Sequence, residues 1–303
     1  MKLEDLQSDN IEDRRGQSDD GSAGGGFGIP GVGAGGHLGL GAILIIGLIS
    51  YFTGLDPRML INGAQVLQGG GSQVAQTAPA SAPAQSTAAN DQMTHFISAI
   101  LAENEVVWGR VLPAQKNIPY VNPKLVLYTG STASACGGTA EASMGPFYCP
   151  NDQKVYLDTS FFDEMRTKLG GGGDFAYAYV VSHEIGHHVQ NLMGILPKAE
   201  EAEQRAPNKA AANHISVAIE LMADCFAGVW AANANQKWQI LEPGDIEQAV
   251  NTAQAIGDDR LQTAARGYAV PDSFTHGSSA QRIQWLTTGL KSGQIDACNT
   301  FNQ

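Results

Sequence analysis

Two stretches of the chain repeat apolar residues every three to four positions, which is the spacing of one face of an α-helix. The first covers residues 175–192 and the second residues 215–230. Between them, residues 198–213 are polar, rich in Ala and Glu, and interrupted by Pro207. The pattern predicts two packed helices, and it favours a surface helix and loop between them over a cover for a cleft.

Shorter apolar runs bounded by turn residues predict strands at residues 124–129 and 153–158. Further helices are expected near residues 93–113 and 160–169. A run of glycines at 170–173 lacks the Gly-Lys-Ser/Thr sequence of a phosphate-binding loop and is interpreted as a turn. Together these elements predict an α+β fold that is mainly helical and contains a small β-sheet.

The first ninety residues differ in composition from the rest of the chain. Residues 1–36 are mostly charged residues and glycine, which predicts disorder. Residues 38–54 are uncharged and mostly apolar, so residues 37–55 are predicted to form a single transmembrane signal anchor, with an amphipathic or buried helix as the alternative. Residues 56–90, rich in Gly, Ala, Ser, Gln, Thr and Pro, are typical of a flexible linker. The folded domain is then expected at residues 91–303.

Charge and cysteine content indicate where that domain resides. Three Lys or Arg residues precede the apolar segment and Arg58 follows it closely, so the N-terminus is predicted to be cytoplasmic and the domain extracytoplasmic. All four cysteines lie in the domain without a CxxC pair, which favours disulfides over a zinc knuckle. Pairing of Cys136 with Cys149 and of Cys225 with Cys298 is one of three connectivities, and a reduced, buried Cys225 is an alternative.

The chain carries 30 acidic residues against 18 basic ones, which gives a net charge of −12 and a sequence pI near 4.9. No stretch interleaves basic with aromatic residues. Both observations argue against nucleic acid as a partner.

The helix predicted at residues 175–192 contains an HExxH sequence formed by His183, Glu184 and His187. Four residues apart on a helix, the two imidazoles lie on one face and can bind the same metal ion. The pattern is typical of zinc hydrolases, in which the glutamate acts as a general base. His188 points about 100° away from that face, so it is interpreted as a surface or packing residue.

A zinc hydrolase needs a third protein ligand, and Glu220 in the second predicted helix is the candidate. Asp224 lies one turn further on the same face, where it can accept a hydrogen bond from His183 and orient that ring. A third histidine in the pattern HExxHxxGxxH is excluded, because Gln190 and Met193 occupy the required positions. The alternative, an ordinary helix with two solvated acids, is disfavoured by the apolar residues around them.

Longer segments carry a family resemblance: HEIGHH, ELMADCFAGVW from residue 220, IGDDRLQ from residue 256 and FTHGSSAQRIQWLTTGL from residue 274. With these segments the chain resembles the putative neutral zinc metallopeptidase family over nearly its whole length. The ExxxD helix is also similar to that of the gluzincin proteases, thermolysin-like and HtpX-like. The resemblance implies zinc ligands His183, His187 and Glu220, a general base Glu184, and Asp224 as the orienting carboxylate.

His276 lies in a segment that resembles the HPxxxxRI element of HtpX-like proteases, with Gly277 in place of Pro. We hypothesise that His276 donates a hydrogen bond to the oxyanion formed during amide hydrolysis. The alternative is that His276 caps a helix starting near Ser278, while Arg282 pairs with a nearby acid.

These residues predict a membrane-anchored, zinc-dependent endopeptidase of zincin-like fold that uses one Zn²⁺ ion and acts on protein or peptide substrates. The sheet edge between Tyr148 and Leu157 is predicted to pair with the substrate backbone. One alternative is a proteolytically inactive, zinc-containing binding or quality-control module of the cell envelope, and another is hydrolysis of a cell-wall peptide or small amide. Glu184 favours an enzyme, because a purely structural zinc site needs no general base.

Overall fold

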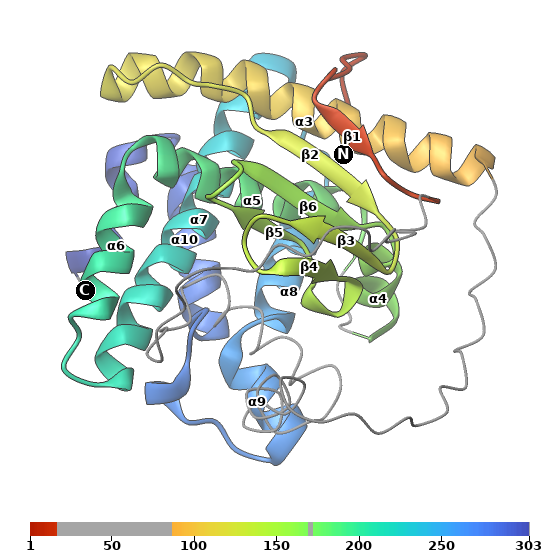
Figure 1. Ribbon diagram of the computed structural model, residues 1–303. Coiled ribbons are helices and arrows are strands. Elements are labelled where there is room, and N and C mark those ends of the chain that lie inside the picture. Colours follow the sequence, from red (N-terminus) through yellow and green to blue (C-terminus); the bar gives the residue numbers. More distant parts are fainter. Residues whose placement is uncertain (17–86, 169–171, 303) are drawn as a thin grey trace, which may run out of the picture.

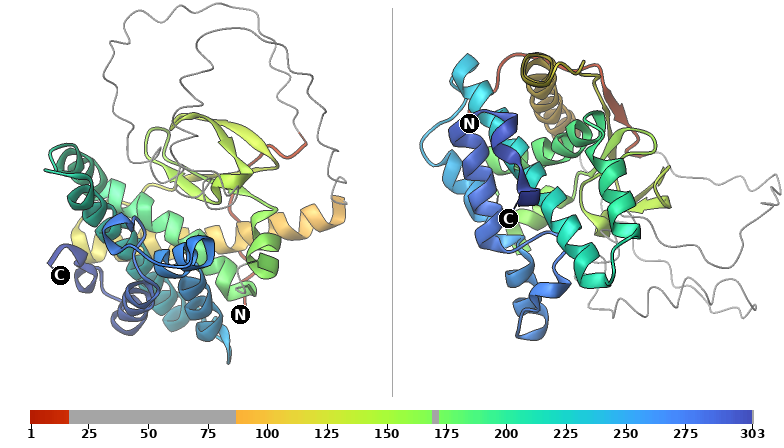
Figure 2. Two further views of the ribbon diagram at one scale, coloured as in Figure 1. Left: turned by 90° about the horizontal axis from the view of Figure 1, so that it is seen from below. Right: turned by 90° about the vertical axis from the view of Figure 1, so that its left-hand side faces the viewer.

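The computed structural model describes residues 1–16, 87–168 and 172–302, in which a small sheet lies against one side of a larger group of helices (Figure 1 and Figure 2). The helices are α3 (Thr87–Lys116), α4 (Phe161–Lys168), α5 (Asp174–Leu192), α6 (Ile195–Gln204), α7 (Lys209–Trp238), α8 (Asp245–Ala255), α9 (Asp258–Arg266) and α10 (Ser279–Ser292). Short 3-10 helices are η1 (Ala142–Met144), η2 (Pro271–Ser273), η3 (Ile295–Cys298) and η4 (Thr300–Asn302). The predicted α+β class, mainly helical with a small sheet, is confirmed.

The main sheet has the strand order β1 (Ile11–Asp13), β2 (Lys124–Tyr128), β6 (Lys154–Asp158) and β5 (Phe147–Cys149). β1, β2 and β6 run parallel, whereas β5 pairs antiparallel with β6. A separate hairpin is formed by β3 (Ser131–Ser134) and β4 (Gly138–Glu141). The two strands predicted from the sequence are confirmed as β2 and β6. The predicted edge from Tyr148 to Leu157 is wrong in its second half, because β6 lies between β2 and β5, so that within this range β5 alone is an edge strand.

Helices α5 and α7 cross in close contact at small residues. A Cβ atom on Gly186 of α5 would come within 3.1 Å of the carbonyl oxygen of Ala223 on α7. Helix α10 also packs closely on α7, since a Cβ atom on Gly289 would lie 1.9 Å from the carbonyl oxygen of Cys225. Glycine at these positions lets the backbones approach, so that side chains of α5 and α10 reach α7.

Helix α7 is the one helix in the described part of the chain that is long and apolar enough to cross a membrane. Because 83% of its most apolar window is buried inside the domain, we interpret it as a core helix. The predicted linker at residues 56–90 ends earlier than expected, since α3 begins at Thr87. The rest of that linker and the anchor predicted at residues 37–55 lie outside the described residues.

The first sixteen residues belong to the folded domain. The carbonyl of Asn10 accepts a hydrogen bond from the N–H of Leu125 at 2.9 Å, and the N–H of Arg14 donates to the carbonyl of Leu127 at 2.8 Å. The disorder predicted for residues 1–36 is therefore wrong for residues 1–16, and the remainder of that prediction lies outside the described residues. The segment has few apolar residues of its own and gains its order from backbone pairing with a strand of the domain, which composition does not reveal.

Glu103 of α3 is a fully buried carboxyl group beneath the N-terminal segment, and its Oε1 atom accepts a hydrogen bond from the N–H of Glu4 at 3.0 Å. Burial raises its pKa to about 7. At pH values between the ordinary carboxyl pKa and about 7, Glu103 is protonated in the native state but ionised in the unfolded chain. The contribution of Glu103 to the free energy of unfolding therefore falls as the pH rises through this range.

We therefore expect Glu103→Gln to raise the free energy of unfolding at pH 8 by on the order of 2 kcal/mol, and to have little effect at pH 4.5. Glutamine is isosteric with the protonated carboxyl group and carries no charge to desolvate. Urea unfolding of both proteins at the two pH values measures the difference, and an equal gain at both would contradict this assignment.

Two disulfides are present in the described residues. Cys136, between β3 and β4, is bonded to Cys149 of β5, and Cys225 of α7 is bonded to Cys298 of η3. Of the three connectivities left open by the sequence, the structure has this one, and the alternative of a reduced Cys225 is wrong.

Candidate metal centre

The three predicted ligands meet where α5 and α7 cross. His183 and His187 project from α5 and Glu220 from α7, and each residue is at most 9% exposed. The Nε2 atom of His183 lies 3.2 Å from Oε2 of Glu220, and the Nε2 atom of His187 lies 3.4 Å from Oε1. The three ligand atoms lie within 4.8 Å of one another. Two helices thus bring a His-His-Glu set to one point.

This spacing fits a zinc ion. Zn–N and Zn–O bonds of about 2.0–2.2 Å in a tetrahedral arrangement place neighbouring ligand atoms roughly 3.3–3.6 Å apart. The distances from His183 to Oε2 of Glu220 and from His187 to Oε1, 3.2 and 3.4 Å, are close to that range. Three protein ligands leave a fourth position for water or substrate, which distinguishes catalytic zinc sites from structural ones.

The second nitrogen atom of each imidazole is held by a neighbouring side chain. Nδ1 of His183 lies 2.9 Å from Oδ1 of Asp224, and Nδ1 of His187 lies 2.9 Å from Oε1 of Gln190. Gln190 in turn donates to the carbonyl of Ile219 at 2.7 Å, which fixes its amide. With Nδ1 as the donor in both rings, Nε2 is left as the metal-binding atom.

Asp224 is fully buried, and three further hydrogen bonds reach its carboxylate. The Tyr179 hydroxyl donates at 2.6 Å, and Arg282 of α10 donates from Nε and Nη2, both at 2.8 Å. Arg282 is only 3% exposed, so the two charges form a bidentate ion pair away from water. Burial raises the pKa of Asp224, but Arg282 and His183 outweigh burial and hold that pKa at about 2.

The same acids control protonation of the metal site. Burial lowers the pKa of His183, but Asp224 and Glu220 outweigh burial and raise it to about 10. A metal ion at neutral pH therefore displaces a proton from His183, and its affinity weakens as the pH falls. Glu184, next to His183 on α5, is 7% exposed, and burial raises its pKa.

His276 sits in a loop that is held by Asp258 at the start of α9. One carboxylate oxygen of Asp258 accepts the backbone N–H groups of Thr275, His276 and Gly277 at 2.8, 2.7 and 3.0 Å. The other oxygen lies 3.5 Å from Nδ1 of His276. Four contacts to one carboxylate thus fix both the backbone and the imidazole of this loop.

The loop lies directly on α7, beside the metal ligands. Gly277 has a φ angle of 96°, and a Cβ atom there would lie 3.1 Å from Cδ2 of Leu221, the residue after Glu220. Burial lowers the pKa of His276, but Asp258 and Glu220 outweigh burial and raise it. The influence of Glu220 on this pKa means that the His276 imidazole lies close enough to the Glu220 carboxylate to interact with it.

The helix-capping role considered for His276 is filled by Ser278. The Ser278 side chain accepts from the N–H of Gln281, which completes a capping box at the start of α10. The other half of that interpretation agrees with the structure, because Arg282 pairs with an acid, and that acid is Asp224.

Asp224→Asn is expected to weaken zinc binding by about 10–100-fold, since an orienting carboxylate raises the basicity of its histidine and fixes its tautomer. Competition with a chelator of known affinity measures the change, while circular dichroism checks that the variant is folded. Asp272→Asn, at an exposed residue, is the matched control. Equal zinc affinity of Asp224→Asn and wild type would show that Asp224 does not support zinc binding.

We did not predict from the sequence that Tyr179, Gln190 and Asp258 belong to the site. Helical spacing carries a signal for the first two, because Tyr179 lies one turn before His183 and Gln190 lies three residues after His187 on α5. No comparable signal exists for Asp258, whose partners lie 17 to 19 residues away.

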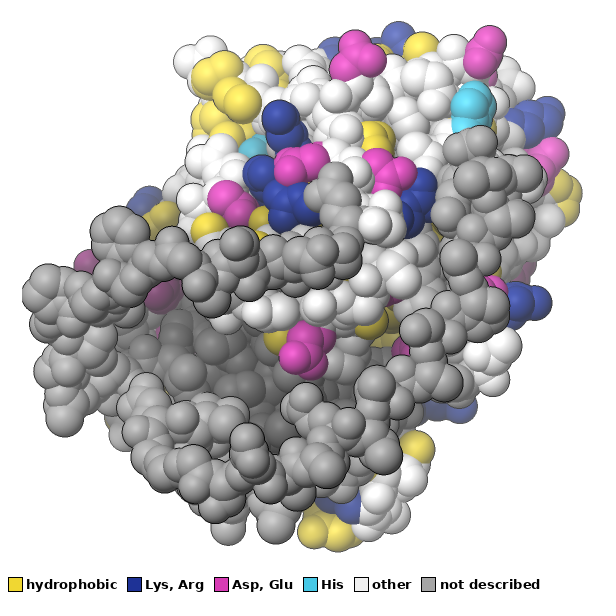
Figure 3. Space-filling model, turned by 45° about the vertical axis from the view of Figure 1, so that its right-hand side comes forward, with side chains coloured by type: hydrophobic (Ala, Val, Ile, Leu, Met, Phe, Trp, Pro, Cys, Tyr) yellow, Lys and Arg dark blue, Asp and Glu magenta, His cyan; other side chains and the backbone are white. Residues whose placement is uncertain are grey.

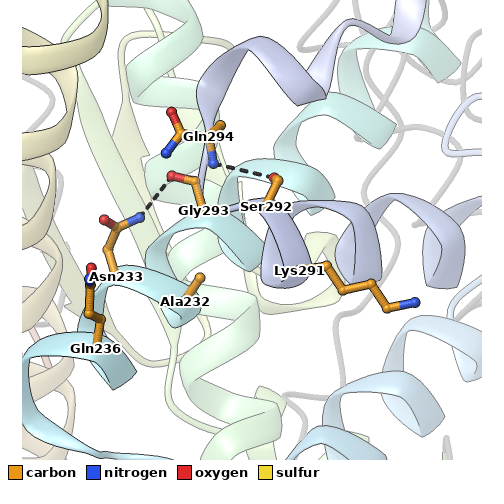
Figure 4. Close-up of a pocket in the computed structure, with 7 residues that line it drawn as sticks. All are labelled: Ala232, Asn233, Gln236, Lys291, Ser292, Gly293 and Gln294. Carbon is orange, nitrogen blue, oxygen red and sulfur yellow. Dashed lines mark hydrogen bonds between the residues drawn. The ribbon is translucent and has the colours of Figure 1, made fainter.

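A polar pocket lies elsewhere on α7, lined by Ala232, Asn233 and Gln236 and by residues 291–294 at the end of α10 (Figure 4). Within it, Asn233 donates to the carbonyl of Gly293 at 3.1 Å. Ala232 is twelve residues beyond Glu220, roughly 18 Å along the helix, so the pocket is separate from the metal centre.

Known proteins are similar in sequence to this chain. The family model described as "Putative neutral zinc metallopeptidase" matches residues 2–301. The uncharacterized protein YpfJ of Escherichia coli (strain K12) is 46% identical over 298 residues, which cover 98% of this chain and 97% of YpfJ. The uncharacterized protein Mb2605 of Mycobacterium bovis is 42% identical over 208 residues, 65% of this chain and 67% of that protein. No solved structure matches the chain. The chain belongs to the family of putative neutral zinc metallopeptidases.

Proposed function

We propose that this chain is a zinc-dependent endopeptidase that hydrolyses peptide bonds with metal-activated water. The observation that carries the proposal is the convergence of His183, His187 and Glu220 at zinc-binding distances, with Glu184 beside them and no fourth His, Cys, Asp or Glu in this cluster among the described residues. A site that only stabilised the fold would have four protein ligands and no use for a buried glutamate at its rim.

Zinc bound at this centre would lower the pKa of its water toward about 7 and polarise the carbonyl of the peptide bond. In this proposal Glu184 accepts the proton of the attacking water and passes it to the leaving nitrogen. His276, whose Nδ1 atom lies 3.5 Å from Asp258, would donate to the oxyanion that forms at the carbonyl oxygen.

The edge strand β5 supports a protein or peptide as the substrate. The hydroxyl of Tyr148 on β5 lies 3.0 Å from Nδ1 of His188 and accepts from Asn191 at 3.0 Å, so the edge is fixed to the helix that carries the histidines. An extended peptide paired with β5 would be held close to that helix. On the face in Figure 3, basic side chains are interspersed with acidic ones, a surface poorly suited to nucleic acid.

An extracytoplasmic location is part of the proposal. The two disulfides support it, because such bonds form and persist in oxidising compartments. Membrane attachment through residues 38–54 stays a prediction.

His276→Ala is expected to lower kcat by about 10²–10³-fold, the loss typical of removing one oxyanion donor, while zinc content stays at one ion per chain. His214→Ala, at an exposed histidine of α7, is the control and should match wild type. Steady-state kinetics on one peptide substrate, with zinc assayed in the same samples, measure both quantities. Unchanged kcat would leave His276 with a structural role.

The proposed function is tested by digesting a diverse peptide mixture with the full-length protein and identifying the products by mass spectrometry. Zinc-loaded protein is expected to cut, and chelator treatment to stop it until zinc is restored. Glu220→Ala should stay inactive with or without added zinc. A wild-type protein that holds stoichiometric zinc and cuts nothing would reject the endopeptidase and favour an inactive zinc-containing binding module.

A further inference from the structure

The N-terminal segment, residues 1–16, contacts the domain at both of its ends. At its start, the amine of Met1 lies 3.1 Å from Oδ1 of Asp245 on α8, and the N–H of Lys2 donates to the carbonyl of Ile240 at 2.9 Å. At its other end, β1 pairs in parallel with β2. In Figure 1 the segment runs beside α3 between these points.

Polar side chains of α3 bind the middle of the segment. The N–H of Ser8 donates to Oγ of Ser98 at 2.9 Å, and Ser8 is only 8% exposed. The carboxylate of Glu105 accepts from the Ser8 hydroxyl at 2.7 Å and from the Asn10 amide at 2.8 Å. These contacts match donors with acceptors, as in the interior of a domain.

The segment also pairs with β2, a strand whose residues are unsuited to an exposed edge of a sheet. Residues Leu125 to Tyr128 of β2 are fully buried, and without β1 they would form an apolar edge with unpaired backbone groups. Leu3 and Ile11 pack against the main core, and Glu12 binds Nζ of Lys154 on β6 at 2.8 Å. The segment is therefore a structural part of the domain.

We infer that residues 1–16 and the domain from residue 87 onward occupy the same compartment. A strand can pair with β2 only on the side of a membrane where β2 lies. Any arrangement that placed the two on opposite sides of a membrane would break this pairing. A shared compartment contradicts the predicted combination of a cytoplasmic N-terminus and an extracytoplasmic domain. This conclusion does not depend on whether the protein cleaves peptides.

Cysteine labelling of the full-length protein in bacterial spheroplasts tests the inference. Asp9, on the N-terminal segment, and Lys198, on α6, are both exposed, and each is changed to cysteine in a separate variant. A membrane-impermeant maleimide is applied before and after lysis. We expect Asp9→Cys and Lys198→Cys to be labelled equally in intact spheroplasts.

Labelling of Lys198→Cys in intact spheroplasts, with Asp9→Cys labelled only after lysis, would overturn the inference. Labelling of both only after lysis would support a shared compartment and contradict the extracytoplasmic location. The two proposals can therefore fail separately.

Hydrogen exchange on the purified full-length protein tests the strand pairing itself. The N–H of Leu125, which donates to Asn10, is expected to be protected in the wild type. Arg14→Pro removes the N–H that is bonded to Leu127 and is expected to speed exchange in β2 while leaving α5 protected. Rapid exchange at Leu125 in the wild type would remove the basis of the inference.

Discussion

Replacing Glu184 by glutamine is expected to lower kcat/KM for peptide hydrolysis by about 10²–10⁴-fold, the usual contribution of a positioned general base. Glutamine keeps the size and polarity of the side chain but cannot accept the proton of the attacking water. The candidate metal ligands are His183, His187 and Glu220, so the amount of bound zinc should not change.

Steady-state kinetics on a single peptide, with zinc determined in the same sample, give both quantities. Glu200→Gln, at an exposed glutamate of α6, is the control and should behave like wild type. Wild-type kcat/KM in Glu184→Gln would show that another group is the base, and loss of zinc would show that Glu184 is a ligand.

Arg282→Met is expected to lower the free energy of unfolding by about 3–5 kcal/mol, the cost of leaving one charge of a buried pair without its partner. Two of the guanidinium hydrogen bonds of Arg282, both at 2.8 Å, go to Asp224, which is fully buried. Methionine fills much of the same volume and donates no hydrogen bond, so the carboxylate would have to be desolvated without a compensating cation.

Urea unfolding of the metal-free proteins measures this change without a contribution from zinc binding. The matched control is Arg205→Met, whose ion pair with Glu201 is exposed and should contribute at most about 1 kcal/mol. A loss below about 1 kcal/mol in Arg282→Met would mean that Tyr179 and His183 alone hold the Asp224 carboxylate.

The cluster of His183, His187 and Glu220 could be predicted because each helix carries its own part of the candidate site. His183 and His187 lie one turn apart on α5, and Glu220 and Asp224 lie one turn apart on α7. Helical periodicity therefore places each pair on one face, and only the crossing of the two helices remains to be formed. The glycine inside the HExxH motif permits that crossing.

Helical periodicity could not predict the residues that other elements contribute to the site. Arg282 is 58 residues from Asp224, and its position depends on how α10 packs on α7. The order of residues 1–16 was missed for the same reason, because it comes from pairing with Leu125 and Leu127, more than a hundred residues later. Composition measures what a segment can bury by itself, whereas this segment depends on a distant strand.

The disulfide between Cys225 and Cys298 closes a covalent loop over a sequence separation of 73 residues. That loop begins at the residue after Asp224 and contains Asp258, His276 and Arg282, the residues from outside α5 and α7 that were described above around the candidate metal centre. Closing a loop of this length lowers the conformational entropy of the unfolded chain and so stabilises the folded state by roughly 4 kcal/mol at 25 °C. Reduction of this single bond would therefore lower the stability of the fold that holds these residues in place, without altering any candidate metal ligand.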